Sequence, residues 1–329
     1  MTKTFSFSGL LPRRKFLATA LILVAAVTSA PAFAADKVAT INIDWATYNP
    51  LSIVIKAKGW MEQEFAKDGT QVNWVQSPGS NIAISAMNSK AVDFGSTAGA
   101  AALMGRINGG EFKSVYVFSK PEWTAMVTRK DSAIKSVTDL KDKRVAAARG
   151  TDPHIFLILA LKANKMTVKD IKLVLMQHKD GQQAIETGEV DAWMGLDPLM
   201  AQSELKGSGR LFYRNPDFNT YGLLNVREEF AKANPEQVTR VLGVYEKARK
   251  WALENPAEVK AAMVAASGLP DDVIARQLER TDLKQSAVGA PQRATILAAG
   301  QALQEAGVIP PDIDVAKTLD AMLDAHYLK

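Results

Sequence analysis

Two segments of this chain, 98 positions apart, share one pattern: AMNSKAVDFGSTAGAAAL begins at Ala86 and AIETGEVDAWMGLDPLMA begins at Ala184. Each has Ala followed by Met or Ile, four variable residues, Val-Asp, a glycine turn and an apolar stretch. This order is typical of a helix, a short buried strand, a turn and a second helix. Because the chain repeats the unit, we predict two similar α/β lobes that face each other.

The segments around the repeat alternate between short strands and helices, which indicates mostly parallel sheets with helices on both faces. The strands of the first predicted unit are residues 38–44, 71–76, 92–95, 115–118 and 125–129. Those of the second unit are residues 144–148, 171–176, 191–194 and 210–213. After a last strand at 223–226, helical patterns dominate. We therefore predict lobe 1 from residues 35–130 and 223–329, lobe 2 from 131–222, and crossings near 129–131 and 215–222.

The first 34 residues have the features of a secretory signal peptide. A positively charged start precedes the apolar run 16–27, and the small-x-small motif at 32–34 predicts cleavage after Ala34. The sequence RRKFL at 13–17 fits the twin-arginine pattern, and an ordinary Sec signal with two arginines is the alternative. We therefore expect a cleaved N-terminal signal and export.

Charge and cysteine content narrow the choice of partner and compartment. The first 34 residues hold four of the 40 Lys and Arg and none of the 35 Asp and Glu, so the remainder carries 36 basic against 35 acidic residues. This balance favours neither nucleic acid nor an anionic membrane as partner. The chain has no cysteine, so it has no disulfide and no site for a lipid anchor. We expect a free monomer in the periplasm.

Polar residues stand at several predicted helix N-termini, where free backbone N–H groups and the helix dipole can bind an anion. These residues are Ser80, Asn81, Ser96, Thr97, Gly150 and Thr151. The plainer interpretation is that they only cap helices, since Ser, Thr and Asn are preferred N-caps. If the turns converge between the lobes, they form one anion clamp.

Further side chains are candidates for contact with a ligand. Arg149, at the end of a predicted strand, could fork onto an oxyanion or simply lie on the surface. Asp197 could bind an ammonium or hydroxyl group or act as an N-cap. Aromatic side chains near predicted strand ends could enclose a ligand or belong to the core. These aromatic residues are Trp45, Tyr48, Trp193 and Tyr221.

Catalytic motifs find little support. The three histidines, His154, His178 and His326, form no H-E-x-x-H motif, and there is no G-x-S-x-G motif or close carboxylate pair. The segment GSTAGAAALMG lacks the lysine of a P-loop and the G-x-G-x-x-G spacing. We expect no catalytic residue, no metal and no cofactor.

Four motifs together resemble one known family. They are AVDFGST at 91–97, DSAIKSVTDLKDKRVA at 131–146, RGTDPHIFL at 149–157 and EVDAWMGLDP at 189–198. The chain resembles the periplasmic solute-binding proteins of ABC importers for aliphatic sulfonates, taurine and nitrate, to which fungal pyrimidine-precursor synthases are distantly related. The resemblance implies a two-lobed periplasmic binding protein fold of type II. It also implies capture of a small organic oxyanion by cleft closure and delivery to an inner-membrane ABC permease.

The resemblance also assigns residues and leaves alternatives. It places the anion at the turns of Ser80–Asn81, Ser96–Thr97 and Gly150–Thr151, with residues 45–50, including Tyr48 and Asn49, lining the cleft. Ala98-Gly99-Ala100 and Leu196 depart from the family pattern where the ligand's tail would lie. An aliphatic sulfonate or taurine-like compound is the first candidate. Nitrate, bicarbonate, a sulfate ester and an aromatic or pyrimidine ligand are alternatives. An enzyme on the synthase scaffold is a further one, but the cysteines it would need are absent.

Overall fold

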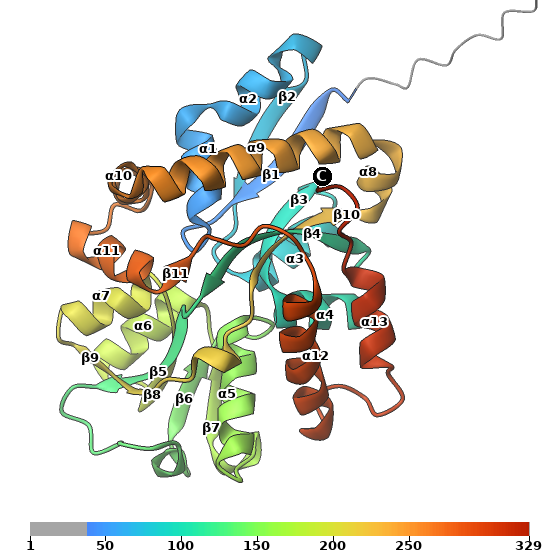
Figure 1. Ribbon diagram of the computed structural model, residues 1–329. Coiled ribbons are helices and arrows are strands. Elements are labelled where there is room, and N and C mark those ends of the chain that lie inside the picture. The colour runs from blue at the N-terminus through green and yellow to red at the C-terminus, as the bar shows by residue number, and fades with distance from the viewer. Residues whose placement is uncertain (1–37, 329) are drawn as a thin grey trace, which may run out of the picture. The chain divides into compact units, whose positions relative to one another are not determined.

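The computed structural model describes residues 38–328 and shows two mixed sheets flanked by helices (Figure 1). The predicted export signal and its cleavage point lie outside the described residues. The strands are β1 (Thr40–Trp45), β2 (Gln71–Gln76), β3 (Phe94–Ala98), β4 (Phe112–Pro121), β5 (Thr124–Arg129), β6 (Arg144–Ala147), β7 (Lys172–Leu175), β8 (Ala192–Leu196), β9 (Gly209–Tyr213), β10 (Gly222–Arg227) and β11 (Thr281–Asp282). In the part described, no helix is both long and apolar enough to cross a membrane.

The helices comprise α-helices and four short 3-10 turns. The α-helices are α1 (Pro50–Lys58), α2 (Trp60–Phe65), α3 (Ser80–Asn88), α4 (Gly99–Ile107), α5 (Asp152–Ala163), α6 (His178–Thr187), α7 (Leu199–Leu205), α8 (Glu228–Ala233), α9 (Pro235–Glu254), α10 (Pro256–Ser267), α11 (Asp271–Glu279), α12 (Ala290–Glu305) and α13 (Val315–Met322). The 3-10 turns are η1 (Ala66–Asp68), η2 (Val137–Leu140), η3 (Val168–Asp170) and η4 (Pro216–Phe218).

Lobe 1 is built on the six-stranded sheet β11-β4-β10-β3-β1-β2. Strand β1 pairs in parallel with β2 and β3, while β10 joins β3 and β4 antiparallel. The long helix α9 buries Val238, Val241, Tyr245 and Ala248, whose spacing of three or four residues produces one apolar face. Helix α9 packs on α1 and α2, and α12 and α13 pack on α4, as Figure 1 shows. The C-terminal helices α9, α12 and α13 therefore pack on lobe 1, and α11 and α12 also contact α7 and α5 of lobe 2.

Lobe 2 is built on the five-stranded sheet β7-β6-β8-β5-β9. Strand β6 pairs in parallel with β7 and β8, whereas β5 is antiparallel to β8 and β9. Helix α5 supplies Phe156 and Leu157 to one apolar cluster, and α6 supplies Ala184 and Ile185 to another. The predicted α/β class is confirmed, but each sheet is mixed rather than mostly parallel, because the strands that cross between the lobes join it antiparallel.

The chain crosses between the lobes at residues 122–123 and again at residues 214–221. Strand β5 belongs to the sheet of lobe 2, so the predicted first boundary at residue 130 lies too late. The error arose because β5 is apolar and follows β4 closely, and only its pairing with β8 reveals its sheet. The second predicted boundary, at residues 222–223, falls where β10 begins in lobe 1.

The two repeated sequence segments make equivalent hydrogen bonds through their aspartates. In lobe 1 the Asp93 carboxylate accepts from the backbone N–H of Asn42 at 2.8 Å. In lobe 2 the Asp191 carboxylate accepts from the backbone N–H of Arg144, also at 2.8 Å. Both aspartates thus tie the start of a strand to its parallel neighbour. The helix–strand–turn–helix prediction holds for both copies, α3–β3–α4 and α6–β8–α7.

Candidate functional site

Three helix N-termini from the two lobes meet at what we term the interlobe site, formed by residues 79–81, 149–151 and 177–178. Asn81, in the first turn of α3, lies against lobe 2: its Nδ2 is 3.5 Å from Oε1 of Gln177, the residue before α6. A Cβ added to Gly150, just before α5, would be 3.6 Å from the Asn81 Cβ. Gly150 has φ of 75°, in the left-handed region that favours glycine. The predicted convergence of residues 80–81 with Gly150 is therefore present in the structure.

The interlobe site offers donors for an anion at three helix N-termini and at Arg149, while the buried Asp152 carboxylate stands at the start of α5. None of the three helices α3, α5 and α6 has a side chain bonded to its N-terminal N–H groups. The first N–H groups of a helix have no partner within the helix, and its dipole is positive at that end. Arg149, beside Gly150, is exposed and has no ion pair or hydrogen bond among the described residues. The pKa of His154 is lowered to about 4, chiefly by burial and secondly by the charge of Arg149. Such a site suits an anion.

Two side chains at the interlobe site, those of His178 and Asn81, have buried polar atoms without hydrogen-bond partners among the described residues. Within the described residues, the two ring nitrogens of His178 and the Oδ1 of Asn81 accept and donate no hydrogen bond. His178 is only 4% exposed. Burial lowers its pKa to about 4, so its imidazole is neutral at pH 7. Sequence reasoning missed His178 as a site residue, because a histidine after a strand has no motif of its own.

Ser80 and Thr151 are placed at the interlobe site as predicted, and their hydroxyls also support the local backbone. Ser80 Oγ accepts from the backbone N–H of Ala98 at 3.0 Å, which ties the start of α3 to the end of β3. Thr151 Oγ1 donates to the carbonyl oxygen of Ala148 at 2.6 Å and closes the turn before α5. Ser80 retains its hydroxyl proton for a ligand, whereas Thr151 offers its backbone N–H.

Ser96, Asn49 and Tyr48 instead form a buried network inside lobe 1. Ser96 lies within β3, not at a helix start, and its N–H and Oγ donate to Asp44 at 2.8 and 2.7 Å. Asn49 Nδ2 donates to Ser96 Oγ, and the Tyr48 hydroxyl donates to the Ser96 carbonyl oxygen, both at 2.9 Å. Burial raises the pKa of Asp44 to about 6 despite these bonds. A ligand anion at Ser96 would face the buried Asp44 carboxylate, which disfavours Ser96 as an anion contact.

Thr97 and Trp193 are also withdrawn into the lobes. Thr97 is fully buried in β3, where its Oγ1 accepts from Asn225 Nδ2 at 2.8 Å. Trp193 is 1% exposed and packs in the core of lobe 2, where a Cβ on Gly181 would come within 2.5 Å of its ring. The prediction that Trp193 lines the cleft is wrong, because the alternation of β8 directs this side chain toward α6.

Asp197 and two aromatic candidates have structural partners. Asp197 is buried, accepts from the backbone N–H of Ala201 at 2.9 Å and faces Arg280 at 3.4 Å. Burial outweighs the attraction of Arg280 and raises the Asp197 pKa to about 7. It therefore bridges lobe 2 to the C-terminal helices rather than offering a free carboxylate. Trp45 is half-buried with the Lys56 Nζ 5.8 Å from its ring centroid, and Tyr221 is buried in the lobe 1 core.

The two crossing segments are fastened by one carboxylate that the sequence analysis did not select. Asp152, the first residue of α5, accepts from Trp123 Nε1 at 2.8 Å in the first crossing. It also accepts from the N–H of Thr220 at 3.0 Å and from its Oγ1 at 2.7 Å in the second. Burial raises the Asp152 pKa to about 6. The start of α5, which belongs to the interlobe site, is thus coupled to both crossings.

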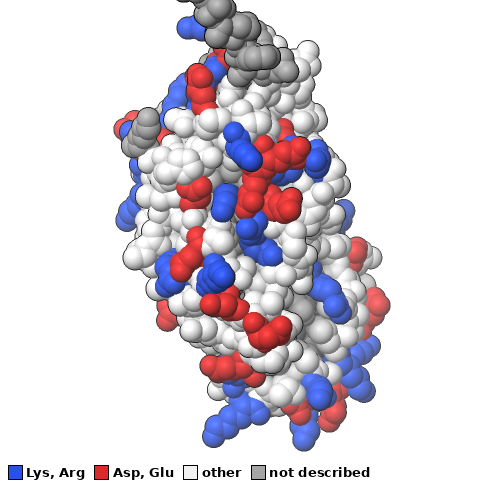
Figure 2. Space-filling view, turned by 90° about the vertical axis from the view of Figure 1, so that its right-hand side faces the viewer, with Lys and Arg blue, Asp and Glu red and all other residues white. Residues whose placement is uncertain are grey.

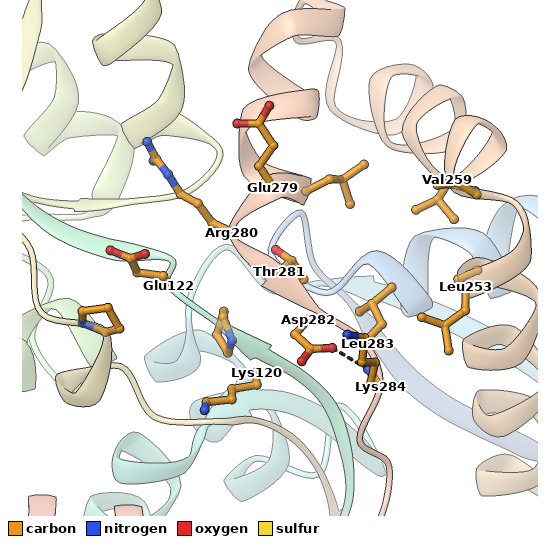
Figure 3. A pocket seen from close by; sticks show the side chains of 15 residues that line it. Lys120, Glu122, Leu253, Val259, Glu279, Arg280, Thr281, Asp282, Leu283 and Lys284 are labelled. Atoms are coloured by element: carbon orange, nitrogen blue, oxygen red, sulfur yellow. Dashed lines mark hydrogen bonds between the residues drawn. The ribbon is translucent and has the colours of Figure 1, made fainter.

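A pocket of about 560 Å³ lies beside the crossings and shares no residue with the interlobe site. Figure 3 shows Lys120 and Glu122 on one side of it and Leu253 and Val259 on another. Arg280 points away from the pocket toward α7, where it pairs with Glu204. On the face seen in Figure 2, basic and acidic side chains are interspersed, and no surface of one sign dominates.

Two mixed sheets, each flanked by helices and joined by two crossings, define the class of periplasmic binding proteins. Within this class the chain belongs to the NMT1/THI5-like family, which it matches over residues 50–259. It is 26% identical to a protein of Bacillus subtilis strain 168 assigned as an aliphatic sulfonates-binding protein, over 70% of each chain. The corresponding Escherichia coli K12 protein is also 26% identical, over 69% of this chain and 71% of that one.

Solved structures agree with this fold. The alkanesulfonate-binding protein SsuA of Xanthomonas axonopodis pv. citri, bound to MOPS, superposes with a TM-score of 0.79. The identity is 23%, and the alignment covers 87% of this chain and 98% of SsuA. The desulfurization enzyme DSZB shares the fold at a TM-score of 0.65 and 13% identity, covering 88% of this chain and 97% of its own. The fold therefore accommodates both binding proteins and at least one enzyme.

Proposed function

We propose that this protein is an exported solute-binding component of an ABC importer that captures a small oxyanion between its lobes. The observation that carries the proposal is the meeting of three uncapped helix N-termini, one from lobe 1 and two from lobe 2, beside Arg149. A ligand held by both lobes favours the closed form, because it has partners there that the open form lacks. The closed form would then deliver the ligand to a permease in the inner membrane.

An organosulfonate is the ligand we propose first. Two relatives assigned as sulfonate-binding proteins and an SsuA structure with a bound sulfonate buffer support it. A sulfonate head has three oxygens that can each accept from N–H groups, which suits converging helix N-termini. Nitrate, bicarbonate, a sulfate ester or a pyrimidine remain alternative ligands of the same clamp.

A binding role suits the titratable groups near the interlobe site better than catalysis does. The buried aspartates nearby, Asp44, Asp152 and Asp197, are each bonded to structural donors. His154 and His178 have pKa values of about 4, so neither is poised to exchange protons at neutral pH. The enzyme alternative predicts turnover of a bound sulfonate, which mass spectrometry of the incubated ligand would reveal.

The proposal is tested by calorimetry and small-angle scattering on the mature protein. Ethanesulfonate, taurine, sulfate, nitrate, bicarbonate and uracil are titrated into wild type, Arg149→Gln and the matched control Arg293→Gln. Arg293 pairs with Asp320 on the surface, so the control removes the same charge away from the site. We expect a sulfonate to bind, Arg149→Gln to weaken it at least about tenfold, and the control to have no effect.

Closure provides the second readout. The radius of gyration should fall when the ligand saturates a protein stripped of bound solute. Oxyanion binding that is equally strong in Arg149→Gln, with an unchanged radius of gyration, would contradict the two-lobe clamp. Tight binding of uracil alone would replace the oxyanion with a pyrimidine ligand.

A further inference from the structure

Asn81 and His178 extend from opposite lobes toward one point in the interlobe site. A Cβ placed on Gly79 would lie 2.8 Å from Asn81 Oδ1 and 3.3 Å from His178 Nε2. Both polar atoms therefore lie close to the backbone of Gly79, and a larger residue there would displace them. Asn81 belongs to α3 of lobe 1 and His178 to α6 of lobe 2, so a group bound between them contacts both lobes.

Both side chains are unpaired at this point, and they are not surface groups that water satisfies. Asn81 Oδ1 and the two ring nitrogens of His178 are buried and without hydrogen-bond partners in the part of the chain described. The contact of Asn81 Nδ2 with Gln177 orients the amide so that its oxygen is the free end. Buried polar groups are nearly always satisfied in folded proteins, so an unpaired cluster at a ligand site indicates a ligand contact.

We propose that Asn81 and His178 together bind a hydroxyl or amino group carried by the oxyanion ligand next to its anionic head. This inference rests on the proposed function and names a narrower ligand class for the same site. A carboxamide oxygen only accepts hydrogen bonds, and a neutral imidazole has one donor and one acceptor nitrogen. The oxygens of a plain oxyanion also only accept, so they leave Asn81 Oδ1 and one imidazole nitrogen unpaired. A ligand O–H group can donate to one of these two acceptors, and an amino group, which has more than one hydrogen, can donate to both.

The neutral state of His178 supports a contact with a hydrogen-bond donor of the ligand rather than with its anionic head. Burial is the cause of its lowered pKa, and no charged side chain contributes to the shift. The helix N-termini and Arg149 hold the anionic head, while the uncharged Asn81–His178 pair binds a hydrogen-bond donor of the ligand. The preferred ligands are then small acids with a donor two or three bonds from the head, such as 2-hydroxyethanesulfonate and taurine.

The test compares ligand pairs that differ only in the donor. Binding of 2-hydroxyethanesulfonate and taurine is measured against ethanesulfonate, hydroxymethylphosphonate against methylphosphonate, and glycolate against acetate, by calorimetry at pH 7.5. The proteins are wild type, His178→Phe, Asn81→Leu and the control His326→Phe, whose histidine is exposed near the C-terminus. In wild type and control, the donor-bearing member of each pair that binds should bind at least about tenfold more tightly. In the two site variants the members should differ by less than about twofold.

Each outcome decides the inference. Equal affinities within the pairs in wild type overturn it and leave the oxyanion clamp intact. A preference that survives in both site variants also overturns it, because the donor is then read elsewhere. Failure of every pair to bind overturns it together with the oxyanion assignment. If His178→Phe does not fold, Gly79→Ala is measured instead. Its Cβ would displace Asn81 Oδ1 and His178 Nε2, so this variant should also lose the preference for donor-bearing ligands.

Discussion

Asp152 holds both crossing segments, so replacing it tests how the lobes are joined. Asp152→Asn keeps the shape: its amide oxygen can accept from Trp123 Nε1 and the Thr220 N–H, and its amide nitrogen can donate to Thr220 Oγ1. It therefore imitates the protonated carboxyl group. Asp152→Ala removes every acceptor and leaves three buried donors, Trp123 Nε1 and the N–H and hydroxyl of Thr220, without this partner.

The magnitudes follow from the pKa and the bonds. The folded-state pKa of Asp152 is about 6 against an ordinary 3.8, so the folded state binds the proton more tightly than the unfolded state. Wild type therefore loses stability as pH rises from about 4 to about 6, by about 3 kcal/mol in total. Asp152→Asn lacks this loss. Asp152→Ala costs about 3–9 kcal/mol at pH 4.5 for the three donors left without an acceptor, and about 2 kcal/mol of that is offset at pH 7.5.

The assay is urea unfolding followed by circular dichroism at pH 4.5 and pH 7.5 for the three proteins. His154 and His178 titrate over part of the same range with the opposite sign, but they are common to all three, so differences between proteins isolate Asp152. Of the total of about 3 kcal/mol, about 1 kcal/mol is already lost at pH 4.5, so relative to wild type Asp152→Asn should gain about 2 kcal/mol of unfolding free energy between the two pH values. The same difference at both pH values would refute a buried, ionised Asp152 at the crossings.

Two further substitutions test the structural roles of Asp197 and Trp193. Arg280→Met leaves Asp197 buried without its counter-ion and should destabilise the protein by about 3–5 kcal/mol at pH 8.5, measured by urea unfolding. The loss should be smaller at pH 5, where Asp197, with its raised pKa, is protonated. A larger loss at pH 5 than at pH 8.5 would contradict the ion pair. Trp193→Ala should cost about 3–5 kcal/mol while calorimetry on the folded fraction finds ligand affinity unchanged, and weakened binding without lost stability would return Trp193 to the site.

The fold was largely predictable because its information is local and repeated. The α12 and α13 patterns, with Pro, Gly and Asp at their ends, predict helix bounds to within a residue or two. The place of β5 was not predictable, because its apolar residues suit either sheet and only long-range pairing with β8 decides. The apolar spacing of residues 51–67 predicts one helix, but the structure divides it at Gly59, which adopts a left-handed φ of 63°.

The site was predictable where glycine and helix starts coincide, and not where strand ends resemble them. Gly150 and Ser80 precede or begin helices, and the structure brings their turns together. Ser96 and Thr97 have the composition of an N-cap pair, yet β3 continues through them to Ala98. Because the strand extends to Ala98, both hydroxyls are buried in lobe 1. The sequence contains no signal that distinguishes a helix N-cap from a strand end at these positions.

Pairing, rather than residue type, separates the structural polar groups of this protein from those available to a ligand. Asp44, Asp152 and Asp197 are charged or titratable and buried, yet each is bonded to donors of its own chain, so each stabilises an arrangement of strands or lobes. His178 and Asn81 are ordinary residues in ordinary helix turns, but their buried atoms lack partners. A ligand gains most where it satisfies groups that the protein leaves unsatisfied, because those groups cost free energy until it binds. In the proposed function, the binding energy for closure comes from the helix N-termini and Arg149, together with Asn81, which the resemblance had selected, and His178, which no motif marks.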